Sequence, residues 1–178
     1  MIKILLHTCC STCLGYPYNF LSKNYNVTIF YFNPNIYPES EYRKRLGDIK
    51  KFTEELNVNL IAGGYDYRSW QTYISGLEEE PEGGKRCERC FMYRLQKTAS
   101  MAKSGGFNYF ASTMSISPHK NFKIINNIGK DLEKSYGISY LESNFKKKDG
   151  FKKTIEISKK YAFYRQNYCG CEYSIKEV

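Results

Sequence analysis

Five short runs of apolar and β-branched residues recur along the chain, and each ends at a turn. The two longest, Ile2 to His7 and Val27 to Phe32, are continuous rather than alternating. A strand buried on both faces of a sheet has this pattern, whereas a strand with one wet face alternates apolar and polar positions. Three shorter runs predict further strands: Val58 to Ala62, Tyr109 to Ser112 and Ile138 to Leu141.

Between these runs, apolar residues return every three or four positions, which is the period of a helix with one buried face. One such helix begins at Ser40, its expected N-cap, and places Leu46, Ile49, Phe52 and Leu56 on one side and most of its Lys and Arg residues on the other. Further helices are predicted over Thr12 to Tyr25, Phe91 to Lys103 and Ile124 to Leu132, a helix or loop over Asp66 to Leu77, and loops over 33–40 and 78–84.

Strands that alternate with helices form βαβ units, which predict an α/β fold with a mostly parallel sheet covered on both faces. We expect a single domain over residues 1–178, with a core over 1–144 and a basic C-terminal extension over 145–178. Ligands of such sheets bind beyond the carboxyl ends of the strands. Cys9 and Cys10 follow the first strand, and we expect a helical segment of the extension to bring Cys169 and Cys171 back to the same edge.

The length and composition limit the possible classes of protein. With 178 residues, 42% hydrophobic and 25% charged, the chain is typical of one folded globular domain. No apolar run approaches the roughly 18 residues of a membrane span, and the first run is too short for a signal peptide. We therefore expect a cytoplasmic protein without a membrane partner.

A surplus of positive charge indicates a polyanionic partner. The formal net charge is +9, and aromatic residues make up 16% of the chain. Basic residues neutralise phosphates and aromatic residues stack on bases, so this composition suits a nucleic-acid partner. A Lys-rich surface over an aromatic core explains the same composition. The densest basic stretch, 146–165, combines seven lysines and Arg165 with Phe151, Tyr161, Phe163 and Tyr164.

Seven cysteines occur in three tight groups at positions 9, 10, 13, 87, 90, 169 and 171. An odd number in such groups is unlike a disulfide framework and indicates metal binding or redox chemistry. The pairs Cys10–Cys13 and Cys87–Cys90 suit either a structural zinc ion or an iron–sulfur cluster, and their long separation favours the cluster. The Cys169-Gly-Cys171 pair is either a redox pair or a further pair of metal ligands. His7 and His119 are not assigned catalytic roles, because a lone histidine is more often structural.

Four motifs in order, HTCCSTC (7–13), EPEGGKRCERCFMYRL (80–95), SISPHKN (115–121) and YRQNYCGCEYS (164–174), resemble those of the QueH-type epoxyqueuosine reductases over essentially the whole chain. The resemblance implies a Rossmann-like, HUP-type fold with strand order 3-2-1-4-5. It implies a cobalamin-independent oxidoreductase that removes the epoxide oxygen of epoxyqueuosine at the wobble position of tRNA. Because cysteines occupy the place of the phosphate loop found in ATP-using relatives, we do not expect nucleotide hydrolysis.

The resemblance also implies a cofactor and site residues. Cys9, Cys10, Cys87 and Cys90 correspond to the ligands of a [4Fe–4S] cluster, and Cys169 and Cys171 to a redox-active pair. Cys13 stands at a position that is Cys or Asp in the family, and both are anionic metal ligands, which suggests a second, mononuclear iron beside the cluster.

Contacts to the tRNA anticodon loop are expected from Arg165 and, near the same edge, from Arg43, Asp66 and Trp70, although core packing explains Trp70 equally well. An external, unidentified electron donor is the other expected partner. A zinc-stapled RNA-binding module without catalysis is the alternative to a reductase. A thiol oxidoreductase acting on proteins is disfavoured, because a thioredoxin-like motif belongs to a different βαβ context.

Overall fold

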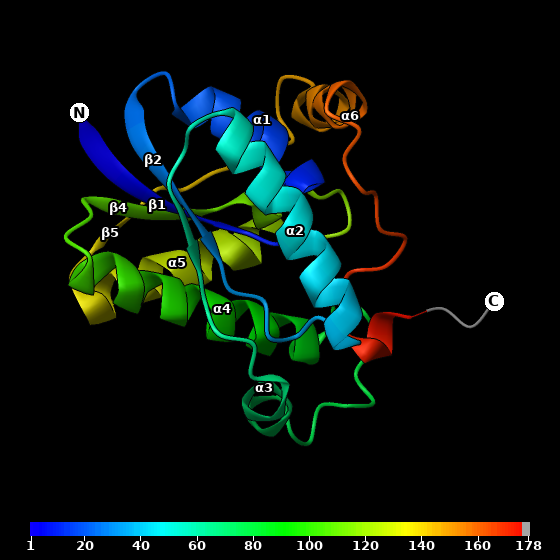
Figure 1. The fold of residues 1–178 in the computed structure, drawn as a ribbon. Coiled ribbons are helices and arrows are strands. Elements are labelled where there is room, and N and C mark those ends of the chain that lie inside the picture. Colours follow the sequence, from blue (N-terminus) through cyan, green and yellow to red (C-terminus); the bar gives the residue numbers. More distant parts are fainter. Residues whose placement is uncertain (176–178) are drawn as a thin grey trace.

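The computed structural model describes residues 1–175, which form a five-stranded parallel sheet with strand order β3-β2-β1-β4-β5 (Figure 1). All four neighbouring pairs of strands run parallel. The predicted α/β class and the predicted order 3-2-1-4-5 are therefore confirmed. The strands are β1 (Ile2–Thr8), β2 (Tyr25–Tyr31), β3 (Leu60–Ala62), β4 (Tyr109–Ser112) and β5 (Ser139–Tyr140).

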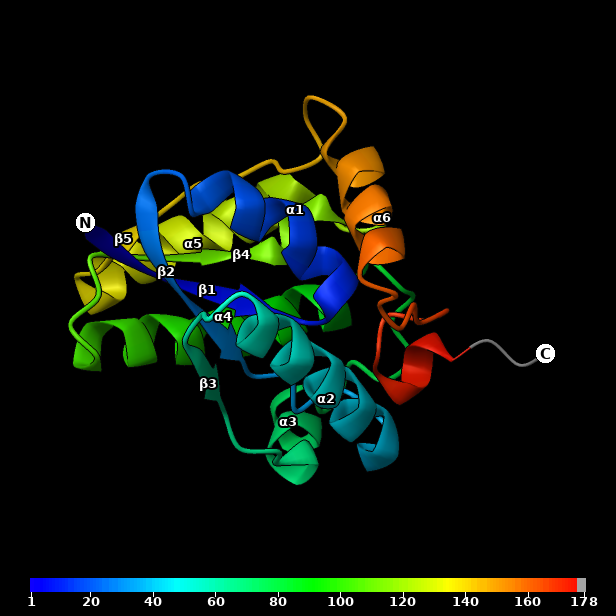
Figure 2. The same ribbon diagram turned by 45° about the horizontal axis from the view of Figure 1, so that its top comes forward.

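Helices cover both faces of this sheet. Figures 1 and 2 show α1, α2 and α6 on one face, α4 and α5 on the other, and α3 beyond the β3 edge. The helices are α1 (Ser11–Leu21), α2 (Glu39–Glu55), α3 (Tyr67–Tyr73), α4 (Lys85–Ser104), α5 (Phe122–Tyr136) and α6 (Gly150–Lys160), with short 3-10 helices η1 (Thr113–Ile116) and η2 (Glu172–Ser174). In the described part of the chain, none of them has the length and apolar character that a membrane crossing requires.

The central strand β1 explains why its sequence is continuously apolar. Successive side chains of a strand point to opposite faces. Ile4 and Leu6 accordingly pack in the core under α1 and α2, whereas Leu5 packs in the core under α4 and α5. All three are completely buried. From Ile4 onward both faces of β1 are thus dry, whereas Ile2 and Lys3 at its start are exposed.

Several element boundaries differ from the sequence-based prediction. The first helix stops at Leu21 instead of Tyr25, because Tyr25 already pairs with Ile2 as the first residue of β2. The second helix begins at Glu39, after Pro38 rather than at a Ser40 cap. The fourth begins at Lys85, six residues earlier than predicted, so that Cys87 and Cys90 lie on its first two turns.

The extension packs against the core through α6 and α1. An added Cβ on Gly15 of α1 would lie 2.7 Å from Ile157 Cγ2 of α6, so only glycine permits this close approach. The hydroxyl of Thr154 in α6 also donates a hydrogen bond to the Thr12 carbonyl at 2.5 Å. From α6 the chain returns across the carboxyl ends of the strands to η2, as Figure 2 shows.

Candidate active site lined by cysteine thiols

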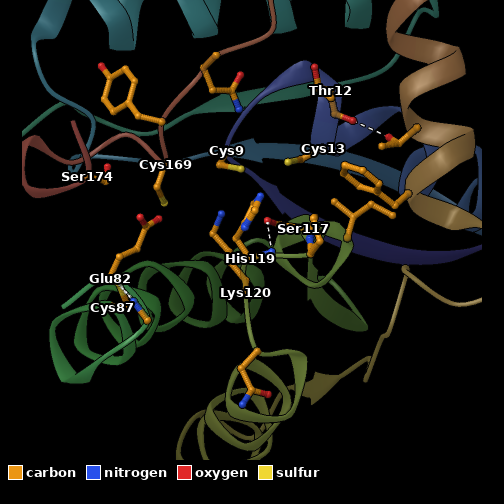
Figure 3. A pocket seen from close by; sticks show the side chains of 18 of the residues that line it. Cys9, Thr12, Cys13, Glu82, Cys87, Ser117, His119, Lys120, Cys169 and Ser174 are labelled. Carbon is orange, nitrogen blue, oxygen red and sulfur yellow. Dashed lines mark hydrogen bonds between the residues drawn. The ribbon is translucent and has the colours of Figure 1, made fainter. Parts of the chain in front are cut away.

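A cavity of about 400 Å³ opens beyond the carboxyl ends of the strands. Its walls come from the segment after β1, the start of α4, the loop between η1 and α5, α6 and the returning tail. Figure 3 shows Cys9 and Cys13 on one side of the cavity, Cys169 and Cys87 on another, and His119 and Lys120 facing them. Three cysteine groups that are far apart in sequence therefore meet at one cavity, as the parallel topology predicts.

The first group follows β1 at the start of α1. The sulfur atoms of Cys9, Cys10 and Cys13 all lie within 4.8 Å of one another. Cys10 is the N-cap of α1, and its sulfur accepts hydrogen bonds from the Cys13 backbone N–H at 3.4 Å and from Gln166 Nε2 at 3.0 Å. The positive end of the helix dipole also favours negative charge at this place.

These three thiols share negative charge unequally. Hydrogen bonds from Cys10 and Cys13 lower the pKa of Cys9 well below its usual range. The hydrogen bond with Cys13 favours the Cys10 thiolate, but its contact with Cys9 and burial together raise the pKa of Cys10 to about 12. Hydrogen bonding to Cys10 and Cys9 raises the pKa of Cys13. Within this group, negative charge is therefore most favourable at Cys9, where the Cys10 and Cys13 thiols stabilise it.

The second group lies on the first two turns of α4. Cys87 and Cys90 are three residues apart, so they project from the same side of the helix. Cys87 lines the cavity, and its sulfur accepts a hydrogen bond from the Gly83 backbone N–H at 3.2 Å. Cys90 is buried, and burial raises the pKa of its thiol. A metal ion that replaced the proton on Cys90 would stabilise the buried thiolate.

The two cysteines of the tail face different surroundings. Cys169 lines the cavity, whereas Cys171 is buried in a cluster with Trp70, Ile74 and Cys90. Gly170 between them has φ +142°, a conformation that favours glycine. Burial raises the pKa of Cys171 to about 11. All seven cysteines carry free thiols.

Two cations face the thiols. Burial lowers the pKa of Lys120, but the nearby cysteines, first Cys169 and then Cys9 and Cys13, raise it by more, so the net shift is upward. Burial likewise lowers the pKa of Arg94, and the nearby cysteines, first Cys90 and then Cys169, raise it by more. Both side chains therefore stay protonated and offset negative charge at the sulfur atoms.

The donor set fits a thiolate-bound metal centre. Thiolates are the ligands that iron–sulfur clusters and zinc prefer. Within residues 1–175, the one group of acidic, histidine and cysteine side chains compact enough for a single ion has three thiols, Cys9, Cys10 and Cys13, while a closed structural zinc site needs four ligands. Cys87 and Cys90 lie outside that group, so the arrangement suits a body larger than one ion.

The predicted substrate contacts are not all brought together. Arg165 lines the cavity. Arg43 instead forms an exposed ion pair with Glu39, and Asp66 caps α3 by accepting hydrogen bonds from Ser69. Trp70 is 0% exposed, so it packs in the core and has no surface to offer a base.

The histidines differ in their surroundings. His7 is buried, with its ring nitrogens bonded to Ser112 Oγ at 3.2 Å and the Phe32 carbonyl at 3.1 Å, which is the structural role expected from the sequence. His119 lines the cavity. Sequence analysis did not single out Lys120 or Gln166, although the first belongs to the SISPHKN motif and the second to YRQNYCGC.

Comparison with known structures defines the class of protein. The fold is similar to a chain described as a predicted subunit of tRNA methyltransferase from Methanocaldococcus jannaschii (TM-score 0.59, 15% identity, 86% of this chain and 75% of that one). It is also similar to the U34-tRNA thiolase NcsA of Methanococcus maripaludis, described with its [4Fe–4S] cluster (TM-score 0.55, 13% identity, 98% of this chain and 61% of that one). The chain is thus a Rossmann-like α/β protein of this structural class, with a cysteine-lined cavity at the carboxyl edge.

Sequence comparison then identifies the family. The family model described as Epoxyqueuosine reductase QueH matches residues 4–177, and the chain belongs to this family. The Epoxyqueuosine reductase QueH of Streptococcus pyogenes serotype M1 is 43% identical over 180 residues, which cover 98% of this chain and 71% of the relative. That of Thermotoga maritima is 37% identical over 183 residues, which cover 99% and 92%.

Proposed function

We propose that this protein is an epoxyqueuosine reductase, which removes the epoxide oxygen of epoxyqueuosine at the wobble position of tRNA to give queuosine. Family membership supports the reaction and the tRNA substrate. The observation that carries the site is the meeting of three cysteine groups at one cavity, with Cys9, Cys13, Cys87 and Cys169 in its wall. The reaction needs two electrons and two protons, and it releases water.

Cys9, Cys10, Cys87 and Cys90 would hold a [4Fe–4S] cluster. When bound, such a cluster supplies electrons one at a time. The start of α4 and the start of α1 present these thiols at two helix N-termini, where negative charge is favoured. Cys13 would hold a second iron ion beside the cluster, because its sulfur lies in the same compact group as Cys9 and Cys10.

Cys169 and Cys171 would act as the two-electron reservoir. When two thiols form a disulfide they release two electrons and two protons, the amounts consumed when an epoxide becomes an alkene and water. Cys169 lines the cavity and Cys171 lies behind it in the buried cluster with Cys90. We therefore assign Cys169 as the member of the pair nearer the substrate. An external electron donor must then reduce the disulfide.

The cavity wall offers groups that bind a polar, modified base. Arg165, Gln166 and Lys120 come from the tail and from the loop before α5. Their side chains provide hydrogen-bond donors in the cavity wall. Of the contacts expected from the sequence, Arg165 is the one that this arrangement supports; Arg43, Asp66 and Trp70 lie outside the cavity wall.

The anticodon loop would approach over α6. Phe151 lines the cavity and is 41% exposed, so it offers an aromatic surface for stacking on an unpaired base. Lys152, Lys153, Lys159 and Lys160 are exposed on the same helix. Phosphates that pass beside the cavity would meet these lysines.

Anaerobic purification tests the proposal. We expect a brown protein with at least about four irons per chain, which converts an epoxyqueuosine-containing tRNA to the queuosine form when a chemical reductant is supplied. The visible spectrum, metal analysis and nucleoside analysis of the digested tRNA measure this. A colourless protein with one zinc per chain would instead support the alternative, a zinc-stapled RNA-binding module.

A further inference from the structure

Arg94 is a buried cation with an unused donor. The residue lies on α4, one turn beyond Cys90, and is 1% exposed. Its Nε donates to the Cys90 carbonyl at 3.4 Å, and its Nη1 donates to Asn33 Oδ1 at 3.3 Å. Its buried Nη2 has no hydrogen-bond partner in the described structure.

Among residues 1–175, no carboxylate forms an ion pair with Arg94. The ion pairs in this part of the chain involve Arg43, Arg45 and Lys130 instead. Burying a guanidinium without a counter-charge is costly, so a fold that keeps one in its interior must offset the charge with an anion. The ionisable groups that raise the pKa of Arg94 are Cys90, Cys169, Cys9 and Cys87, which come from all three cysteine groups.

Hydrogen bonds through Asn33 connect the Arg94 guanidinium to the end of β1. Asn33, which accepts the hydrogen bond from Arg94, donates through Nδ2 to the Thr8 carbonyl at 2.8 Å. Thr8 is the last residue of β1 and directly precedes Cys9. A short chain of hydrogen bonds therefore joins the segment that bears Cys9 to the helix that bears Cys90, with Arg94 between them.

We propose that Arg94 is a positioning residue that offsets the negative charge of the metal centre bound by the cysteines and thereby raises the reduction potential of that centre. The inference rests on the proposed function, since it requires an iron–sulfur cluster. Each electron added to a cluster makes it more negative, and a fixed cation close by stabilises the reduced form more than the oxidised form. The unused Nη2–H would be available to donate to the bound cluster, which acts in the same direction.

The test is a reductive titration of anaerobically purified protein, followed by electron paramagnetic resonance. In Arg94→Gln the midpoint potential should fall below that of the wild type, with iron content unchanged. Arg94→Lys keeps the charge but loses the planar fork, so its potential should lie between the two. Lys97→Gln removes an exposed positive charge from the same helix and should leave the potential unchanged.

Two results would overturn the inference. The first is an iron-loaded Arg94→Gln protein that titrates at the wild-type potential. The second is loss of iron from both Arg94→Gln and Arg94→Lys while circular dichroism shows both to be folded, because the residue would then be needed to build the site whatever its charge. A wild-type protein that holds no iron would overturn the proposed function itself, so the two failures are distinguishable.

Discussion

The guanidinium of Arg45 holds the backbone of Cys169 in place. Nη1 of Arg45 donates to the Cys169 carbonyl at 2.9 Å, and Nη2 donates to the Tyr168 carbonyl at 3.3 Å. Its Nε pairs with Glu41 at 2.8 Å, and the side chain is buried. A residue of α2 therefore fixes the position of the tail cysteine, although the sequence pattern predicted most basic residues of this helix to lie on its exposed side.

Replacement of Arg45 by lysine should destabilise the fold and reduce turnover. Lysine cannot donate to two carbonyls and a carboxylate in the same fork geometry, so buried acceptors lose their partner, at a cost of about 2–4 kcal/mol in the free energy of unfolding. Arg43→Lys is the matched control, because Arg43 lies on the same helix and pairs with Glu39 at the same spacing, with the two side chains 74% and 50% exposed. Urea denaturation of both variants measures the difference, and equal stability would contradict the assigned role of Arg45.

Replacement of Cys169 by serine should abolish turnover without loss of iron. Serine keeps the size of the side chain and the backbone contacts to Arg45, but it cannot form a disulfide. The reductase assay and iron analysis on the same preparation separate the two effects. Unchanged turnover would remove the pair from the mechanism, and loss of iron would make Cys169 a metal ligand instead.

Replacement of Cys13 by alanine distinguishes one iron site from two. With a cluster and a second ion, the wild type should contain about five irons per chain, and Cys13→Ala should retain about four together with the visible absorption of the cluster. Cys9→Ala should lose both, since Cys9 belongs to the same compact group. A wild type with about four irons, unchanged in Cys13→Ala, would show that no second ion is bound there.

Substrate binding should weaken as salt rises, and exposed lysines of α6 should account for part of the slope. The double variant Lys152→Gln, Lys159→Gln should lower the slope of log affinity against log salt concentration by about 1–2, if each lysine meets one phosphate. The control is Lys50→Gln, Lys51→Gln, which removes two exposed charges from α2. Filter binding of tRNA at several salt concentrations measures both, and equal slopes would exclude α6 as the phosphate-binding surface.

The helices and strands could be predicted because they follow from the local pattern of residues. The convergence of the cysteines could be predicted because it follows from the parallel arrangement of the strands. Continuous apolar runs identified the strands, and the parallel topology then required Cys9 and Ser112 to lie at one edge. The early start of α4 was missed because Gly83 and Gly84 are typical of a loop, whereas Lys85 and Arg86 favour a helix.

The buried cations could not be predicted. Arginine is almost never fully buried unless it is paired, so the amino-acid sequence gives no reason to place an arginine in the core. Arg45, Arg86 and Arg94 are nevertheless buried. Arg45 and Arg86 donate hydrogen bonds to backbone carbonyls of loops, and Arg94 donates to the Cys90 carbonyl and to Asn33 Oδ1. The tail carbonyls that accept from Arg45, and Asn33 beside Arg94, belong to segments that are distant in sequence, and only the tertiary structure brings them together.

The location of Cys169 affects how the protein is made. A ribosome releases Cys9, Cys10 and Cys13 early, and nearly the whole chain follows before the segment that faces them is synthesised. Until that segment docks on Arg45, the early thiols lie uncovered by it and are open to oxygen and stray metal ions. The chain topology thus separates in time the synthesis of the two sides of the site.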